Sequence, residues 1–256
     1  MFDNAIVRPP GPGFSEGLTS AGLGPPVLEE ALAQHDRYCD ALSRCGAALT
    51  WLEPDPRHPD ATFVEDTAVL TERGAILARP GAPSREGEVA GIRSALAHFY
   101  RSFRAIVPPG TLDGGDVCQA GGHFFIGISG RTNHEGARQL ASFLAEDGYT
   151  SACVDLRGVG GLLHLKSGMA RLGDRRLVLV AALAGRDPFG AYEIVVVDAA
   201  ESYAANCVRV NEHVLLAAGH PKLRAALLGM GYPVIELEMS EFRKMDGGLS
   251  CLSLRF

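Results

Sequence analysis

The sequence lacks several features that would assign a protein to a class at once. None of its apolar runs approaches the roughly 18 residues that a membrane-spanning helix needs, so we expect no membrane partner. The opening stretch, M-F-D-N-A-I-V-R-P-P, has no basic segment followed by an apolar one, which is the pattern of a secretory signal. We therefore expect a cytoplasmic protein.

Cysteine motifs are also missing. The six cysteines form no C-x-x-C pair, and their spacing does not fit a four-ligand zinc site. A chain of 256 residues is too large for a disulfide scaffold, so the thiols are expected to be free in a reducing compartment. Cys118 and Cys207 lie within alternating apolar residues, which predicts positions in the core.

Positive charge is in deficit. The chain has 24 basic and 30 acidic residues and a formal net charge of -6, which argues against nucleic acid as a partner. In other respects the composition is ordinary for a globular protein, with 46% hydrophobic and 21% charged residues. A chain of this length can bury a substantial core.

What the sequence does contain is a repeated pattern of strand, turn, strand, helix and strand. In one copy, Gly121-Gly122 separates two apolar runs, which is typical of a β-hairpin. A helix with one apolar face follows over 137–144 and ends at Gly148. The first copy has its helix over 27–44, whereas the copy over 168–198 leaves little room for one.

The pattern recurs in about five units of roughly forty to fifty residues, a period typical of propellers and related arrays. Such a unit cannot bury its own apolar face, so the units should pack around a common axis. The alternative is a single doubly wound sheet, but no crossover begins with a glycine-rich phosphate loop and the hairpins are antiparallel. We predict one α/β domain over 1–256, a five-bladed α/β propeller of ββαβ-type repeats around a pseudo-fivefold axis.

The end of the chain, M-D-G-G-L-S-C-L-S-L-R-F, raises a question about Cys251. Asp-Gly-Gly is turn chemistry, and Leu252, Leu254 and Phe256 alternate with polar residues, which predicts a half-buried strand. A free cysteine is more often a small buried hydrophobe than a nucleophile. The local sequence alone favours the inert interpretation.

Other polar residues gather where the expected strands meet turns. Taken singly, each has an ordinary explanation: an aspartate caps a turn, and a lone histidine between two leucines belongs to the core. The combination is unusual, because a thiol, an imidazole and several carboxylates all fall at turns of one closed ring, most of them beside glycine. The candidates are Asp60, Glu65, Asp66, Asp113, Asp116, His164, Lys166, Ser167 and Cys251, with Arg85 and Arg131 at helix entries.

This set of groups predicts the charge of a ligand. A Cys–His pair supplies a nucleophile and a general acid/base. Carboxylates around it would repel an anion but match a planar guanidinium through paired hydrogen bonds. Two arginines elsewhere in the pocket would hold a carboxylate. The ligand deduced is an arginine-like amino acid with a cation at one end and a carboxylate at the other.

The motifs E-G-L-T-S, F-V-E-D-T, L-D-G-G-D, R-T-N, L-H-L-K-S and D-G-G-x-S-C, spread along the whole chain, resemble those of the dimethylarginine dimethylaminohydrolases. These enzymes belong to the guanidine-modifying superfamily, whose fold is the five-unit α/β propeller. The resemblance implies hydrolysis of asymmetric dimethylarginine and monomethylarginine to citrulline and an amine. It implies no metal and no organic cofactor.

The resemblance also implies roles for particular residues. Cys251 would be the nucleophile, His164 the general acid/base and Asp113 its supporting carboxylate. Asp66 would hold the guanidinium, with Glu65 beside it in the pocket wall. The remaining contacts would be Arg85 and Arg131 to the substrate carboxylate, and Asp60 with the carbonyls of Leu18 and Met245 to the α-amino group. Leu18 would belong to a mobile lid flanked by glycines.

Two positions bear on this assignment. Bacterial members of the family carry Glu where this chain has Asp113, and we expect function to survive the loss of one methylene. Arginine deiminases place an acid two residues after the active histidine, where this chain has Lys166. That exchange removes a partner for unsubstituted guanidinium and favours a methylated substrate.

Two rival interpretations remain open at this stage. One is another enzyme of the superfamily, an arginine deiminase or an amidinotransferase; the other is a catalytically silent protein that binds methylarginine. We also expect a homodimer, because propellers with exposed outer helices often pair. Zinc captured by the thiol and imidazole would inhibit.

Overall fold

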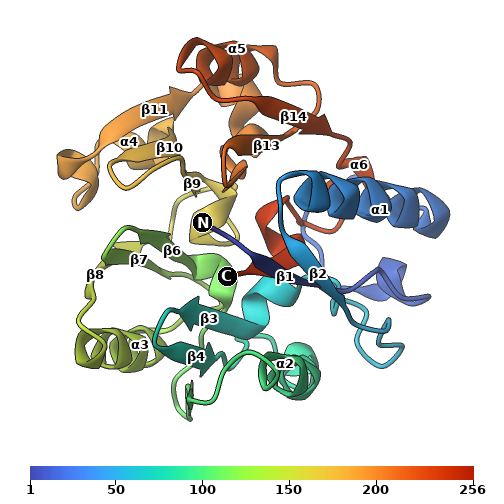
Figure 1. Ribbon diagram of the computed structural model, residues 1–256, viewed down its shortest axis with the longest axis vertical. Coiled ribbons are helices and arrows are strands. Elements are labelled where there is room, and N and C mark those ends of the chain that lie inside the picture. Colours follow the sequence, from blue (N-terminus) through green and yellow to red (C-terminus); the bar gives the residue numbers. More distant parts are fainter.

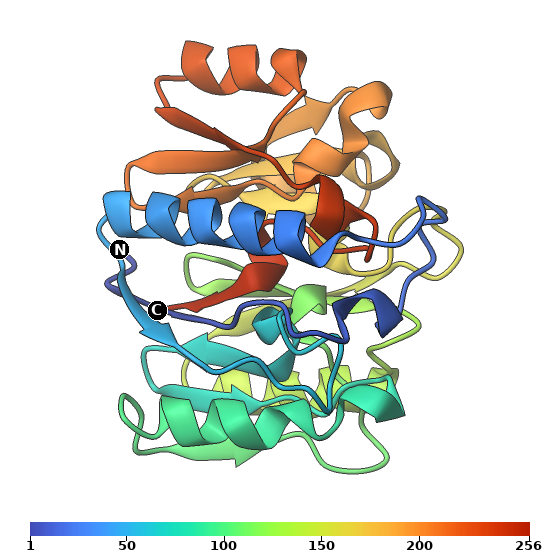
Figure 2. The same ribbon diagram turned by 90° about the vertical axis from the view of Figure 1, so that its right-hand side faces the viewer.

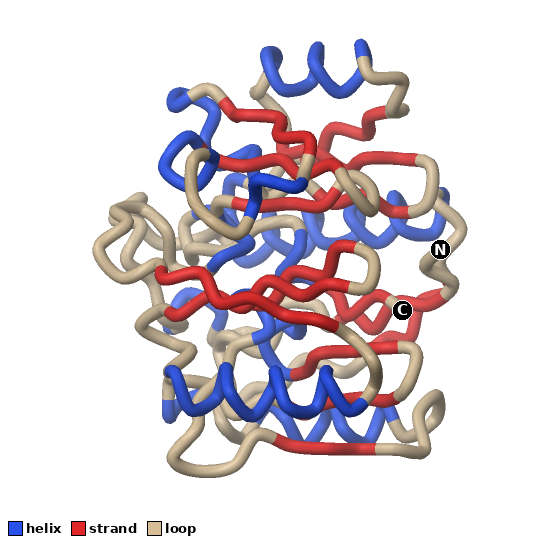
Figure 3. The backbone as a smooth tube through the Cα atoms, turned by 90° about the vertical axis from the view of Figure 1, so that its left-hand side faces the viewer, coloured by secondary structure: helices blue, strands red, loops and turns tan.

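Five small sheets arranged in a ring make up the computed structural model, which describes residues 1–256 (Figure 1). Each sheet has three strands, of which two are antiparallel and the third runs parallel to the middle one. The longer helices lie on the outer side of the sheets, at the top and bottom of the edge-on view in Figure 3. Shorter helical turns lie between the strands. The predicted α/β propeller of five repeats is confirmed.

Four units follow the predicted order of hairpin, helix and parallel strand. They are β3 (Ala68–Thr71), β4 (Gly74–Leu77), α2 (Glu88–Leu96) and β5 (Phe103–Ala105); β6 (Val117–Ala120), β7 (His123–Ile128), α3 (His134–Glu146) and β8 (Thr150–Asp155); β9 (Met169–Arg171), β10 (Arg176–Val180), α4 (Ala181–Ala184) and β11 (Glu193–Val197); and β12 (Val208–Val210), β13 (His213–Ala217), α5 (Pro221–Gly229) and β14 (Val234–Leu237). The short helix α6 (Ser240–Arg243) follows β14.

The two ends of the chain build the fifth unit. It consists of β15 (Ser253–Arg255), β1 (Asn4–Val7), α1 (Leu28–Arg44) and β2 (Ala48–Trp51). The last strand pairs antiparallel with the first, with Leu254 opposite Ile6, and so closes the ring. Both termini therefore lie together at one end of the molecule (Figure 2).

The half-buried alternation predicted for the C-terminal strand is wrong. Leu252, Ser253 and Leu254 are all buried, and Cys251 lies not in a strand but in a single turn of 3-10 helix, Ser250–Leu252. The reason is position, because β15 is an inner strand that contacts β3 of the next unit as well as its own partner β1. An inner strand of this ring has no solvent face.

Local chemistry accounts for the elements of the repeat. Gly121 turns the β6–β7 hairpin with a φ of +62°, a backbone conformation that only glycine adopts without strain. Helix α3 begins where the side chain of Asn133 accepts a hydrogen bond from the Gly136 amide, and Gly148, at φ +86°, follows its end. The apolar face predicted for this helix is buried at Ala137, Leu140 and Leu144.

A short 3-10 helix precedes the inner strand of each unit. These turns are Val64–Thr67, Gly114–Asp116, Leu165–Ser167, Ala199–Ala205 and Ser250–Leu252. We call this side of the ring the turn end. The opposite side, which carries the hairpin loops and both termini, is the hairpin end (Figure 2).

The core lies between the sheets and the outer helices. In the middle strand β10, Leu177, Val178 and Leu179 are completely buried, as expected for a strand covered on both faces. The predicted core cysteines, Cys118 and Cys207, are buried as well. None of the helices combines the length and the apolar character needed to cross a membrane.

Candidate active site

The turn end holds two neighbouring cavities that gather most of the predicted site residues. The smaller, of about 20 Å³, is lined by Leu18, Asp60, Asp66, Arg85, Arg131, His164, Met245 and Cys251, together with four other residues. The larger, of about 520 Å³, is also lined by His164 and Cys251. The thiol and the imidazole therefore face the same space, although 87 residues separate them in sequence.

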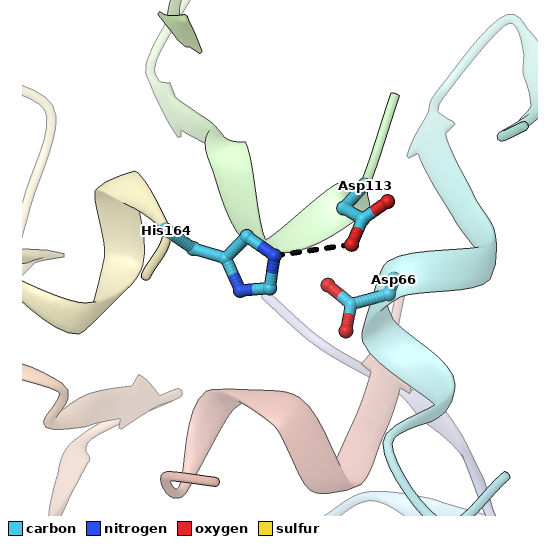
Figure 4. Close-up of side chains that lie close together, drawn as sticks. All are labelled: Asp66, Asp113 and His164. Carbon is cyan, nitrogen blue, oxygen red and sulfur yellow. Dashed lines mark hydrogen bonds and ion pairs between the residues drawn. The ribbon is translucent and has the colours of Figure 1, made fainter. Parts of the chain in front are cut away.

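His164 is held at the entry of the turn Leu165–Ser167 and points at two carboxylates. Its Nε2 lies 3.1 Å from Oδ2 of Asp113, and Asp66 lies beside the same ring (Figure 4). Burial by itself lowers the pKa of His164, but the charges of Asp66 and Asp116 and the bond to Asp113 outweigh it and raise the pKa to about 9. The ring is therefore an imidazolium near neutral pH, the state that can donate a proton.

Glycine at position 115 allows these groups to approach. The Gly115 amide donates to Oδ1 of Asp66 at 2.9 Å. A β-carbon at this position would lie 2.8 Å from that oxygen and 2.9 Å from Nδ1 of His164. Any side chain would push the imidazole and the carboxylate apart, which gives the L-D-G-G-D motif a structural reason for its second glycine.

Asp113 is fixed by the preceding unit and by its own. Its Oδ1 accepts from the Gly81 amide at 2.8 Å, and its own amide donates to Oγ1 of Thr132 at 3.1 Å. The next acid, Asp116, is fully buried and accepts from Leu165, Ser129 and Thr132. Asp116 thus ties down the turn that follows His164.

Cys251 lies in the middle of the turn Ser250–Leu252 and is half-buried. Burial, with the negative charges of Glu65 and Asp66, raises the pKa of the thiol to about 12. The resting sulfur is therefore protonated and weakly nucleophilic. A cation bound next to it would offset the two carboxylates and lower that pKa, so the site can activate its nucleophile when a cationic ligand arrives.

Arg85 and Arg131 differ in how many of their N–H donors other residues already engage. Arg85 is buried and donates to Asp66 at 2.6 Å, to Glu88 at 2.9 Å and to the carbonyl of Phe63 at 3.1 Å. These partners use four of its five N–H groups, since Nε also faces Glu88. Arg131 is partly exposed, and its nearest carboxylate, that of Asp113, is 4.0 Å away. Arg131 is the arginine available to a ligand.

The opposite wall of the small cavity comes from the N-terminal segment and from the residues before the nucleophile. The Leu18 amide donates to Oδ1 of Asp60 at 3.0 Å. Two residues on, the Ser20 hydroxyl donates to Oδ2 of Asp246 at 2.9 Å, and Gly22 and Gly24 have φ values of +65° and +83°. The segment is thus held against Asp246, and its role as a mobile lid stays a prediction.

Glu65 is not part of either cavity at the turn end. Its carboxylate accepts from Ser250 at 2.6 Å, Lys166 at 2.7 Å and Arg255 at 3.2 Å. It lies under the nucleophile's turn, in the middle of the ring, and differs in this from the pocket-wall position expected of it. Its influence on Cys251 is electrostatic.

Several residues that hold the site together belong to no motif that would reveal them in the sequence. Asn206 donates to the Lys166 carbonyl at 2.7 Å and accepts from the Ser250 amide at 2.9 Å, and so links three units. The Tyr203 hydroxyl donates to the Gly247 carbonyl at 2.8 Å. The neighbouring S-Y-A-A-N-C stretch has no special composition, and only its place in the repeat could have pointed to it.

A metal ligand set exists in principle. Asp66, Asp113 and His164 place potential ligand atoms within 4.8 Å of one another. Histidine must be neutral to bind a metal, however, and the raised pKa of His164, about 9, keeps it protonated near neutral pH. This chemistry favours a bound organic cation over a resident metal ion.

The comparisons with known proteins agree with this site. No protein-family model matches the chain. The N(G),N(G)-dimethylarginine dimethylaminohydrolase of Pseudomonas aeruginosa is 44% identical over 257 residues, which cover 100% of both chains. The chain belongs to the dimethylarginine dimethylaminohydrolase family. The family member from Streptomyces coelicolor is 34% identical over 98% of this chain and 96% of its own.

Solved structures of the dimethylarginine dimethylaminohydrolase family match the fold over its whole length. The P. aeruginosa enzyme, as a Cys-to-Ser variant complexed with citrulline, has a TM-score of 0.97 at 44% identity and full coverage of both chains. A His-to-Gly variant, an adduct with S-methyl-L-thiocitrulline, gives 0.96 at the same identity and coverage. The arginine dihydrolase domain of ArgZ, at 18% identity, shares the fold alone.

Proposed function

We propose that this chain hydrolyses N-omega-methylated arginines, asymmetric dimethylarginine and monomethylarginine, to citrulline and dimethylamine or methylamine. One observation carries the proposal: His164, which is hydrogen-bonded to Asp113, shares a cavity with Cys251 in a chain that is 44% identical over its full length to a dimethylarginine dimethylaminohydrolase. The site supplies a nucleophile, an acid and an anionic wall for a cation, which are the parts that this reaction needs.

The residues around the small cavity offer a contact for each polar group of an arginine skeleton. The carboxylate of Asp66 and that of Asp113 would hold the plane of the guanidinium near Cys251 and His164. Arg131, with Arg85 behind it, would meet the substrate carboxylate. Asp60 and the carbonyls of Leu18 and Met245 would meet the α-amino group, since all three residues line the small cavity.

The first half of the reaction forms a covalent bond to sulfur. The bound guanidinium favours the thiolate of Cys251, whose proton leaves to solvent, and the sulfur attacks the guanidinium carbon. As the C–S bond forms, the C–N bond to the methylated nitrogen breaks. His164 gives its proton to that nitrogen, because an amine is a poor leaving group without one. A thiouronium cation remains on Cys251.

The second half returns the enzyme to its starting state. Neutral His164 now accepts a proton from water, whose oxygen attacks the thiouronium carbon. The C–S bond breaks, and the products are citrulline and the thiol of Cys251. His164 keeps one proton, so atoms and charge balance. Asp113 orients the imidazole in both halves and stabilises its charged form.

The choice of methylated over free arginine rests on position 166. An arginine deiminase would need an anion there for the unsubstituted nitrogen, but this chain has Lys166, whose ammonium pairs with Glu65 at 2.7 Å in the middle of the ring. The unsubstituted end of free arginine thus gains no charge partner from this position. We expect the methylated substrate to be preferred.

A product assay distinguishes the candidate functions. The purified chain is supplied with asymmetric dimethylarginine, and citrulline and dimethylamine are quantified together; we expect equal amounts of both. Faster citrulline formation from arginine would assign the chain to the deiminases. A new guanidine formed only when a second amine is added would assign it to the amidinotransferases, and saturable binding without product would make it a silent binding protein.

A further inference from the structure

Three arginines occupy equivalent positions at the hairpin end of the ring. Leu70, Gln119, Arg171, Arg209 and Arg255 each lie on the inner strand of one unit. In register they face Ala75, Phe124, Leu177, Val214 and Ala5, which occupy corresponding places on the middle strands. The five side chains therefore form one layer around the central axis, and three of them are cationic.

This layer surrounds a cavity that is separate from the two cavities at the turn end. An inner space of about 160 Å³ is lined by all five layer residues and, deeper, by Lys166 and Glu65. It continues into an outer funnel of about 1120 Å³, which the same five residues border and which opens between the hairpin loops and the termini. The inner space is ample for a small polyatomic ion with some of its water.

The inner cavity has an excess of positive charge. Four cationic residues line it, Lys166 and the three arginines, whereas Glu65 is its one acidic residue. Glu65 already pairs with both Lys166 and Arg255. The cavity therefore carries a formal charge of +3 in a chain whose net charge is -6.

Two of the arginines have little negative charge to neutralise them. Arg209 donates from Nε to the Asn211 carbonyl at 2.9 Å and from Nη1 to the Leu172 carbonyl, and it makes no salt bridge. The Arg171 side chain makes no hydrogen bond, and its one ion pair is a long contact of 3.9 Å with the exposed carboxylate of Asp174. Arg171 therefore keeps hydrogen-bond donors free at the edge of the inner cavity.

We propose that the inner cavity at the hairpin end binds a small multivalent oxyanion, a phosphate group. A guanidinium fork matches the oxygens of such an anion, and several arginines around one cavity favour it over chloride. The inner cavity lies at the bottom of the outer funnel, where the attraction between opposite charges is stronger than at the open surface. Glu72, Asp174 and Glu212 line the outer funnel but not the inner cavity, so a compact anion fits better than an extended polyanion.

Isothermal titration with inorganic phosphate at constant ionic strength tests the site. Arg171→Gln removes a cation whose one ion pair is the long, exposed contact with Asp174, and Arg37→Gln removes one from the exposed face of α1, away from the cavity. We expect saturable binding to the wild-type chain and to Arg37→Gln, and at least about tenfold weaker binding to Arg171→Gln, the size of a lost charge-assisted hydrogen bond. The thermal midpoint without phosphate checks that each variant is folded.

The outcomes separate the possible sources of the phosphate and can overturn the proposal. Competition by ADP at lower concentration than inorganic phosphate would identify the bound group as part of a nucleotide, and weaker competition would identify free phosphate. Absence of saturable phosphate binding to the wild-type chain, or equal affinities of Arg171→Gln and Arg37→Gln, overturns the site. Because no substrate is added, the result is independent of the proposed hydrolase activity.

Discussion

The two ends of the ring are built from the same repeat, but acids and cations are balanced around the small cavity at the turn end, whereas cations are in excess at the hairpin end. At the turn end, Asp66, Asp113 and Asp60 line or border a cavity together with one thiol and one imidazole. At the hairpin end, Arg171, Arg209 and Arg255 surround a cavity with a single buried acid. The inner strands that connect the ends are only three or four residues long.

The ends also differ in how firmly their polar groups are held. Asp66 and Asp113 each accept hydrogen bonds from backbone amides of other units, so their carboxylates are fixed before any ligand arrives. Arg171 at the other end has no such partner. Preorganised groups of the first kind are what catalysis requires, whereas partly unsatisfied cations suit a binding site that an ion completes.

Replacing the nucleophile should have the largest effect and should be confined to the turn end. Cys251→Ser removes the group that forms the covalent bond, so we expect turnover of asymmetric dimethylarginine to fall by on the order of 10⁴-fold or more. The matched control is Cys118→Ser, the same change in a cysteine that lines the cavity at the hairpin end. Equal losses in both variants, measured as citrulline formed per folded protein, would remove Cys251 from its role.

Glu65 lies between the cavity at the hairpin end and the turn that carries Cys251, and loss of its carboxylate should lower the stability of the fold. In Glu65→Gln, Lys166 and Arg255 lose their shared anion inside the ring. Removing one partner from a buried ionic network typically costs about 3–5 kcal/mol, so the urea midpoint should drop clearly. The control Glu135→Gln breaks an exposed pair with Arg138, which solvent screens, so little or no change in the urea midpoint is expected. Similar midpoints for the two variants would contradict the view of Glu65 as a structural centre.

The sequence predicted the scaffold better than the direction of individual side chains. Hairpins, helices and their glycine ends depend on local patterns, and the predicted repeat therefore appears in the structure. The neighbours Glu65 and Asp66 were both expected in the pocket. Consecutive residues of a 3-10 helix point about 120° apart, so only Asp66 reaches the pocket and Glu65 faces the middle of the ring.

The partners of individual side chains could not be read from the sequence. Arg85 was expected to meet a substrate carboxylate, but Asp66 and Glu88 of its own unit engage most of its donors, pairings that appear only once the unit folds. The arginine layer could not be predicted from the sequence either. Hairpin loops of different length separate Arg171 and Arg209 from their partner strands, so their equivalent positions show only in the strand register. The roles assigned to the site residues, like the homodimer and the single domain over 1–256, stay predictions.

A methyl group should distinguish the crowded end from the open one. Gly115→Ala places a β-carbon 2.9 Å from Nδ1 of His164, and a misplacement of about 1 Å in an active site typically costs about 10²-fold in rate. Gly122→Ala makes the same change in the β6–β7 hairpin loop, where nothing lies within 4 Å of the new carbon. We expect its kcat/KM to stay near the wild-type value. Normal rates for Gly115→Ala would show that the imidazole needs no such close fit.

Two histidines provide the finest test of the contrast, because their pKa values should move in opposite directions. Neighbouring carboxylates raise the pKa of His164 from 6.5 to about 9, whereas burial without such partners lowers that of His123 at the hairpin end. The stabilisation from charged His164 is therefore complete below pH 6.5 and lost as the pH rises through about 9, and kcat/KM should decline over the same rise in pH.

NMR titration of the imidazole signals measures the pKa values of His164 and His123 directly. In Asp113→Asn the His164 value should fall because one anion is gone, while His123 should not change; a His164 that titrates at or below 6.5 in the wild-type chain would refute its role as a charged acid at rest.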